Sequence, residues 1–281
     1  MTISELKSRF ISIVKIKKGG QKTVYKAVAP DNKTFALKVI NNASDQRVLQ
    51  EIELIKRLSI DNVPAIIENG IVFDESIGEN VLFIIEEYIW GISLRDWLNS
   101  GNTCNLKMAY NILKFLLNIE ICLENNKILH RDINPNNIIL GDNGSIYLID
   151  FGLAKDLNGT SYTKTNALHG PFTPGYAPHE QFANVKYKQD VRTDLFQIGV
   201  TIYESCTGRN PFVTDNSTMY QVLSRTMTLV PPALSFAEDT NGMFAQLINM
   251  LMAKNQSQRP NSASDALRYL STITPTLLLE D

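Results

Sequence analysis

The order of the expected secondary-structure elements predicts an α+β protein, because strands gather in the first part of the chain together with one helix. Three early segments contain β-branched residues with turn signals between them, and they predict the strands Ile11–Ile16, Thr23–Val28 and Lys33–Ile40. The next segment, Asp45–Leu58, has helical periodicity and follows Ser44 as a helix cap.

The length of the chain fits either one large domain or two lobes. A chain of 281 residues is ample for a sizeable core. No internal repeat, low-complexity tract or Pro/Gly/Ser linker interrupts it. We therefore expect the only internal boundary at residues 87–91.

Composition excludes several classes of partner. The chain has 27 Lys and Arg against 29 Asp and Glu, a net charge of −2 without basic or acidic blocks, so nothing argues for nucleic acid or a membrane surface as a partner. The apolar runs, such as Val81–Ile85, are far shorter than the roughly 18 residues that span a bilayer, and the N-terminus lacks a signal-peptide core. Cys104, Cys122 and Cys206 have neither an even count nor metal-site spacing. We expect structural thiols and a cytoplasmic protein.

Two short motifs carry the chemistry of the chain. His130-Arg131-Asp132 is followed by Asn137, and the apolar run 146–149, which predicts a buried strand, delivers Asp150 of Asp150-Phe151-Gly152. Phosphoryl transfer from ATP needs one carboxylate to orient the attacking hydroxyl and oxygen ligands to hold Mg²⁺. Asp132 can do the first, and Asn137 and Asp150 the second. Either motif alone would also fit a turn-rich loop with scattered acids; the two in this order favour catalysis.

These motifs resemble those of the eukaryotic-type (Hanks-type) Ser/Thr protein kinase domain, in its bacterial form, and further landmarks of that family run from Ile16 to Arg259. The resemblance implies a bilobal kinase fold, with a small antiparallel β-sheet lobe that carries one helix and a larger, mainly helical lobe. It implies one domain over residues 1–272, with an N-lobe at 1–88, a hinge at 87–91, a C-lobe at 92–272 and a C-terminal tail at 273–281. It also implies transfer of the ATP γ-phosphate to Ser and Thr hydroxyls of proteins, the chain itself included, with Mg²⁺ or Mn²⁺ as the metal.

The resemblance assigns most ATP-binding residues to the first lobe and the hinge. Lys38 in Ala36-Leu37-Lys38 matches the lysine that bridges the α- and β-phosphates, and Glu51 matches the helix glutamate that aligns it. The alternative is a solvated surface lysine, which the apolar neighbours of Lys38 disfavour. The backbone of Glu87 and Ile89 would bind adenine. The other ATP-binding positions are Ile16, Gly19, Val24, Ala36, Glu86 and Ile139.

Four residues depart from the family pattern. Lys17 and Lys22 replace two glycines of the GxGxxGxV loop, and the segment fits an ordinary hairpin equally well. Glu86 occupies the gatekeeper position behind adenine, where a buried carboxylate without a partner would cost several kcal/mol, so we expect it to meet Lys38 or water. The alternative is a shift of the alignment by one residue. Asn134 replaces a lysine, and its amide can donate to the γ-phosphate or to Asp132.

The segment from Asp150 to Glu180 resembles a kinase activation segment. In the family, the threonine that Thr173 matches contacts the catalytic aspartate, so Thr173 joins Asp132, Lys38 and Asn134 as an expected catalytic residue. Related bacterial kinases autophosphorylate where Thr163 and Thr165 lie, although a solvated polar loop is the alternative. The family pattern also pairs Glu180 with Arg259, places Asp194 as a brace at the start of a helix Asp194–Thr207 that ends at Gly208, and makes His130 a packing residue.

Two alternative functions remain. The first is a pseudokinase that binds nucleotide and acts as a scaffold or switch, which the four departures favour and the retained Lys38, Asp132, Asn137 and Asp150 disfavour. The second is a small-molecule kinase on a related fold, which the peptide-platform segment 173–180 disfavours.

Overall fold

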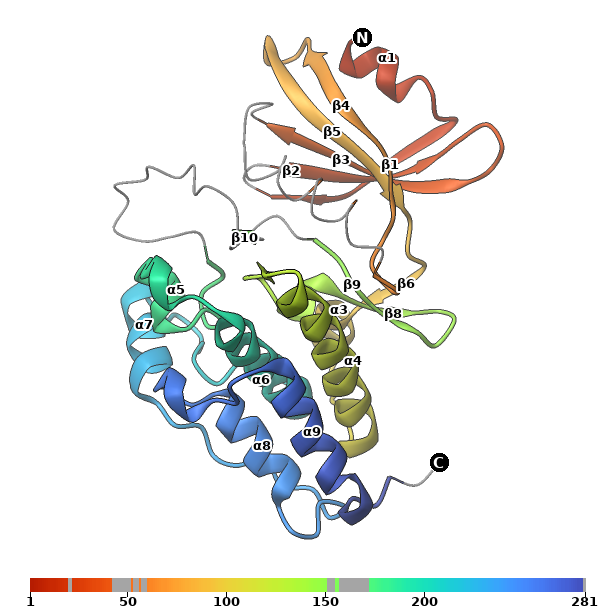
Figure 1. Cartoon of the computed structure of the whole chain (residues 1–281). Coiled ribbons are helices and arrows are strands. Elements are labelled where there is room, and N and C mark those ends of the chain that lie inside the picture. Colours follow the sequence, from red (N-terminus) through yellow and green to blue (C-terminus); the bar gives the residue numbers. More distant parts are fainter. Residues whose placement is uncertain are drawn as a thin grey trace. The chain divides into compact units, whose positions relative to one another are not determined.

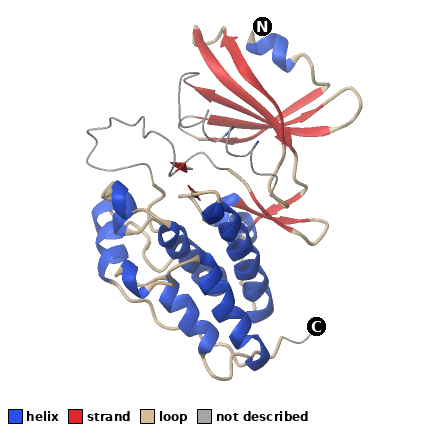
Figure 2. Cartoon of the chain, viewed as in Figure 1, coloured by secondary structure: helices blue, strands red, loops and turns tan. Residues whose placement is uncertain are grey.

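The computed structural model describes residues 1–19, 22–41, 52, 56, 60–150, 155–156 and 172–279. The chain divides into two compact units, which we call the first unit (Met1–Gly91 with Gly141–Asn143) and the second unit (Ile92–Leu140 with Gly144–Asp281). In the described parts the first unit is built mainly of strands and the second mainly of helices (Figure 2).

The first unit is organised around one antiparallel sheet, with strand order β1-β2-β3-β5-β4 (Figure 1). Its described elements are α1 (Ile3–Lys7), β1 (Ser12–Lys18), β2 (Lys22–Val28), β3 (Thr34–Asn41), β4 (Ile66–Asp74) and β5 (Glu79–Glu87). Successive side chains of a strand point to opposite faces, so the sheet buries two apolar clusters. One face carries Leu37, Val39, Phe83 and Ile85 and is covered by Ile3 and Leu6 of α1. The other carries Ile40, Leu82 and Ile84 with Ile52.

The second unit contains a group of packed helices and two small sheets. Its described elements are β6 (Gly91–Ser93), α3 (Leu94–Asn99), α4 (Leu106–Asn125), β7 (Ile128–Leu129), η1 (Pro135–Asn137), β8 (Ile138–Gly141), β9 (Ile146–Leu148), β10 (Lys155–Asp156), α5 (His179–Phe182), η2 (Lys186–Lys188), α6 (Val191–Thr207), α7 (Met219–Thr228), α8 (Met243–Leu251), η3 (Gln256–Gln258), α9 (Ala263–Ile273) and η4 (Thr274–Thr276). One small sheet has the order β6-β8-β9, and β7 pairs with β10.

Helix α6 forms the centre of the second unit, and it packs against α4, α8 and α9 (Figure 1). Almost all its side chains are buried, as expected of a helix with neighbours on every side. Gly199 permits the close approach of α8, since a Cβ there would lie 2.8 Å from Cβ of Leu251. Gly208 ends the helix with φ 73°, in the left-handed region that glycine adopts without steric cost.

The α+β class and the antiparallel sheet are confirmed, and the three early strands end within two residues of the predicted bounds. Two predictions need correction. Helix α6 begins at Val191 and not at Asp194, because the side chain of Asp190 caps it by accepting from the N–H of Arg192. The strand expected over 146–149 ends at Leu148, and only Leu148 in it is fully buried. Of the helix expected over Asp45–Leu58, Ile52 and Lys56 alone are described, and both are helical.

Candidate active site

Asp132 lies at the centre of a hydrogen-bonded loop between β7 and β8, residues 130–137, which we call the catalytic loop. Its carboxylate accepts from Nδ2 of Asn134 and Nδ2 of Asn137, both at 2.9 Å. The hydroxyl of Thr173 donates to the same carboxylate at 2.5 Å, so the contact implied by the resemblance is present. Donors on several sides fix the orientation of the carboxylate, and a fixed carboxylate can orient an alcohol in the same way.

Asn134 is buried, and its amide is used inside the loop. Its Nδ2 also donates to the main-chain carbonyl of Asp132 at 3.0 Å, and its Oδ1 accepts from N and Nδ2 of Asn136 at 3.0 and 3.1 Å. Of the two bonds the sequence left open, the one to Asp132 is formed. Asn134 therefore orients Asp132 and caps η1.

Helix α6 fixes the backbone that precedes Asp132. The carboxylate of Asp194 accepts from the main-chain N–H of His130 at 2.8 Å and of Arg131 at 2.7 Å, as predicted. Arg131 has φ 67°, a left-handed conformation that is strained for a residue with a side chain. Bonds to its N–H and, from Gln181 and Gln197, to its carbonyl hold this conformation in place.

Two further side chains of α6 also bond to the main chain of the catalytic loop. Gln197 accepts from the N–H of Ile133 at 2.7 Å, and the hydroxyl of Thr201 donates to the carbonyl of Ile133 at 3.3 Å. Residues 194, 197 and 201 follow the three-and-four spacing of one helix face. One face of one helix therefore shapes the catalytic loop.

His130 is not an acid or base at neutral pH. Burial lowers the pKa of its imidazole to about 4, although the charge of Asp150 acts in the opposite direction. The neutral ring accepts from the N–H of Asp132 through Nδ1 at 3.2 Å. His130 therefore acts as a packing and positioning group.

Glu120 of α4 is a buried acid whose pKa is affected by the charge of Asp194. No described residue donates a hydrogen bond to either of its carboxyl oxygens. Burial raises its pKa, and the charges of Asp194 and Glu124 raise it further. Burial raises the pKa of Asp194 to about 7, against the lowering effect of its bonds from Arg131 and His130, which Glu120 lacks. We therefore assign the negative charge to Asp194 and a proton to Glu120.

The residues expected to hold a metal offer oxygen ligands. The Nδ2 of Asn137 is bonded to Asp132, and its Oδ1 receives no hydrogen bond from the described residues. The N–H of Ile149 donates to the carbonyl of Asn137 at 2.8 Å and so ties the segment before Asp150 to the catalytic loop. An amide oxygen and a carboxylate are hard donors of the kind that Mg²⁺ and Mn²⁺ bind, so these residues fit a divalent cation.

In the first unit, Lys38 and Glu86 form a buried ion pair. The distance from Nζ of Lys38 to Oε1 of Glu86 is 2.9 Å, and the two side chains are 5% and 7% exposed. The solvated surface lysine considered from the sequence is therefore excluded, and the contact expected for Glu86 is present.

The other expected ATP-binding residues of the first unit lie along the sheet. Val24 is opposite Lys38, and Ala36 is two residues before it on β3, so all three share one face. Ile16 is exposed at a bulge of β1, and Gly19 donates to the carbonyl of Lys22 at 2.8 Å, which closes the β1–β2 hairpin.

The hinge residues and Ile139 complete the expected set. The N–H of Glu87 donates to the carbonyl of Ala65 at 2.9 Å. No described residue bonds the main chain of Ile89. Ile139 belongs to the second unit, where it pairs with Tyr147. Glu51, Phe151, Gly152, Thr163 and Thr165 lie outside the described residues.

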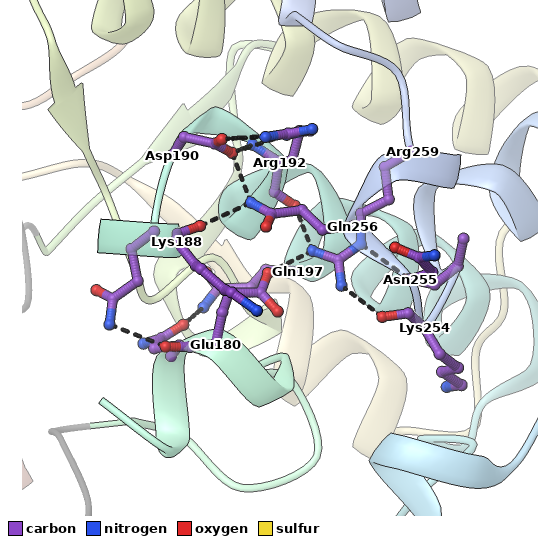
Figure 3. Close-up of polar contacts among 12 residues, drawn as sticks. Glu180, Lys188, Asp190, Arg192, Gln197, Lys254, Asn255, Gln256 and Arg259 are labelled. Carbon is purple, nitrogen blue, oxygen red and sulfur yellow. Dashed lines mark hydrogen bonds and ion pairs between the residues drawn. The ribbon is translucent and has the colours of Figure 1, made fainter. Parts of the chain in front are cut away.

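The buried pair Glu180–Arg259 supports the end of the activation segment, as predicted. The distance from Nη1 of Arg259 to Oε1 of Glu180 is 2.5 Å. The guanidinium also donates to the carbonyls of Ala253 at 2.8 Å, Arg192 at 2.9 Å and Lys254 at 3.5 Å. Figure 3 draws the polar groups around this pair, which come from α5, from η2 and Asp190 just before α6, from α6 itself and from the segment after α8.

Sequence reasoning missed a second polar cluster, formed by Arg95, Tyr176 and Glu204. Arg95 donates to Oε1 of Glu204 at 2.9 Å and to the hydroxyl of Tyr176 at 2.6 Å, and that hydroxyl donates to the other oxygen of Glu204. It also missed Gln197 and Thr201. A signal was present, because polar residues at 194, 197, 201 and 204 interrupt an otherwise mainly apolar helix at helical spacing.

Comparison with known proteins identifies the family of the chain. The family described as "Protein kinase domain" matches residues 10–269. The serine/threonine-protein kinase PknL of Mycobacterium tuberculosis is 30% identical, across 98% of this chain and 68% of its own length. The probable serine/threonine-protein kinase pknA2 of Bifidobacterium longum is 28% identical, across 98% of this chain and 36% of its own. PrkC of Bacillus subtilis is 26% identical, across 88% and 38%.

The chain belongs to the protein kinase family, and it is a Hanks-type Ser/Thr protein kinase domain with the α+β fold of that family. Members of this family act on proteins and use ATP with a divalent metal. The chain spans about a third of pknA2 and of PrkC but two thirds of PknL. Among the described residues, no helix is long and apolar enough to cross a membrane.

Proposed function

We propose that this chain transfers the γ-phosphate of ATP to serine and threonine hydroxyls of proteins, with Asp132 as the residue that orients the hydroxyl. The observation that carries the proposal is the bond of 2.5 Å from Thr173 to Asp132, because it joins the peptide-platform segment to the catalytic carboxylate. Asn134 donates to the same carboxylate oxygen as Thr173, and Asn137 donates to the other oxygen. A substrate hydroxyl at Asp132 would donate its proton toward that carboxylate as the phosphoryl group transfers.

The proposed roles of the remaining residues follow from their chemistry. Lys38 binds the α- and β-phosphates, with Glu51 as its helix partner, and the backbone of Glu87 and Ile89 binds adenine. Asn137 and Asp150 hold the metal, which we take to be Mg²⁺. When bound, Mg²⁺ neutralises negative charge on the phosphates. A cytoplasmic location remains a proposal, supported by cysteines that are free in the described chain.

The test is a transfer assay with a matched variant. Purified protein is incubated with γ-labelled ATP, Mg²⁺ or Mn²⁺, and a generic protein substrate, and labelled amino acids are identified after hydrolysis. We expect label on serine or threonine, and Asp132→Asn should lower the initial rate by about 1000-fold or more. Asp265→Asn, a change of the same kind at an exposed ion pair, should retain activity. Equal rates for Asp132→Asn and the original protein would refute the role of Asp132.

The second candidate is a nucleotide-binding pseudokinase, and the lysines at positions 17 and 22 together with Asn134 and Glu86 favour it. Asn134 is uncharged and so supplies no cation to the γ-phosphate, and its amide donates within the loop. A pseudokinase would bind ADP and ATP and produce no labelled protein with either metal. Labelled serine or threonine that disappears in Asp132→Asn would exclude it.

We further propose autophosphorylation at Thr163 or Thr165, because a phosphate there could pair with Arg131. Mass spectrometry of the protein with Asp132 intact should find phosphate between residues 158 and 170, and Asp132→Asn protein should lack it. Activity that is unchanged when both threonines are replaced by alanine would contradict control through this segment.

A further inference from the structure

The register of the sheet places Glu86 beside Lys38. Lys38 of β3 lies opposite Ile84 of β5, and Glu86 is two residues beyond Ile84 on the same face. A diagonal neighbour of this kind is within reach of a long side chain. The ion pair of 2.9 Å therefore needs no movement of either strand.

The surroundings of the pair make it costly to remove one partner alone. The face that carries it also carries the buried Leu82 and Ile84, and Ile66 of β4 is opposite Glu86. Both charges are almost excluded from water. Removing one partner of a buried pair leaves an uncompensated charge, which is much more costly than removing both.

We propose that Glu86 is a positioning residue that holds the ammonium of Lys38 until nucleotide phosphates displace it. The inference rests on the proposed role of Lys38 as a phosphate ligand. Phosphate binding then exchanges one anionic partner of Lys38 for another and brings more negative charge close to Glu86. Glu86 therefore weakens the binding of phosphorylated nucleotides, and it leaves the binding of the nucleoside part unchanged.

This difference between ligands follows from linkage. A residue changes the affinity of a ligand only if it interacts differently with the free and the bound protein. Adenosine has no phosphate to compete with Glu86, whereas ADP does. A disturbed pocket would weaken both ligands, so the ratio of the two affinities separates charge competition from a purely structural role.

The direct test is calorimetric titration of Glu86→Gln with ADP and with adenosine in one Mg²⁺ buffer. The substitution keeps the shape of the side chain and removes its charge. We expect ADP to bind about tenfold more tightly than to the original protein, with adenosine unchanged. Glu79→Gln is the matched control, since it lies on the same strand and is exposed, and both ligands should bind it normally. An unchanged or weakened ADP affinity, or an equal change for adenosine, would overturn the proposal.

A second measurement tests the proposal even if Glu86→Gln folds poorly. Thermal unfolding of Lys38→Met should occur at a lower temperature than that of the double variant Lys38→Met/Glu86→Met, because the single variant leaves the Glu86 charge buried without the lysine. If the double variant instead unfolds at a lower temperature than Lys38→Met, the pairing of Lys38 with Glu86 is refuted.

Neither measurement needs phosphoryl transfer. If Glu86→Gln binds ADP more tightly but the transfer assay produces no labelled protein, the proposed function is refuted and the inference about Glu86 stands. If labelled protein forms but the ADP affinity of Glu86→Gln is unchanged, the inference is refuted and the proposed function stands.

Discussion

Two buried ion pairs of the described residues, Lys38–Glu86 in the first unit and Arg259–Glu180 in the second, use different cations. Arg259 is planar and donates to three main-chain carbonyls as well as to Glu180, so its geometry is fixed from several directions. Lys38 ends in a compact ammonium on a flexible stem and meets Glu86 across neighbouring strands. Arginine suits a pair that only supports the fold, whereas lysine suits the exchange of partner that we propose for Lys38.

The largest effect expected from this comparison is on stability. Arg259→Ala should lower the free energy of unfolding by about 3–5 kcal/mol, because it leaves the buried carboxylate of Glu180 without its cation. Arg268→Ala is the control: its partner is Asp265, its side chain is 77% exposed, and the expected cost is about 0–1 kcal/mol. Urea denaturation measures both values. Equal costs for the two variants would remove the distinction between the buried and the exposed pair.

The next effect is on activity. Lys38→Ala should lower the rate of phosphoryl transfer by about 100-fold or more, since the phosphates lose their buried cation. Lys22→Ala should lower the rate of phosphoryl transfer less than tenfold. Lys22 lies at the start of β2, where it replaces a glycine of the family's glycine-rich loop. Initial rates with labelled ATP decide between them. A larger loss in Lys22→Ala would point to a phosphate site built on the hairpin.

The smallest effect concerns Glu120, a buried acid whose described neighbours Asp194 and Glu124 are also acidic. Its pKa is raised in the folded protein, so the folded state binds the proton more tightly than the unfolded chain. The stability that this proton contributes is complete below the usual value of 4.5 and is lost as the pH rises through the folded pKa.

Glu120→Gln carries no ionisable group and removes this dependence. From pH 5 to pH 8, its stability relative to the original protein should therefore rise by about 1–2 kcal/mol, measured by urea denaturation across the range. Glu238→Gln, at an exposed position, should follow the original protein at every pH. A constant difference between Glu120→Gln and the original protein would show that Glu120 is ionised in both states.

The fold could be predicted where the pattern is local. β-Branched residues and turn signals predicted the ends of β1, β2 and β3 within two residues. The start of α6 was wrong because its cap, Asp190, lies one turn before the polar residue that drew attention, Asp194. A cap is set by one side chain and its conformation, and periodicity does not report it.

In the candidate active site, too, local sequence patterns predict some features and not others. Motif spacing predicts Asp132, Asn137 and Asp150 as site residues, because the ability of each side chain to bind a metal or a hydroxyl depends on that residue alone. The bonds of Gln197 and Thr201 to the catalytic loop join residues more than 60 positions apart, and no local pattern encodes them. Geometry was likewise needed to choose between the two hydrogen bonds that Asn134 could form.

The polar face of α6 has a consequence for protein engineering. The catalytic loop owes its backbone conformation to side chains of a helix that begins more than 50 residues later in the sequence. A peptide copied from residues 130–137 into another scaffold would carry the reactive groups without the geometry that orients them. A transplant that includes Asp194 and Gln197 on a correctly placed helix would carry both, so the transferable unit is a loop and a helix together.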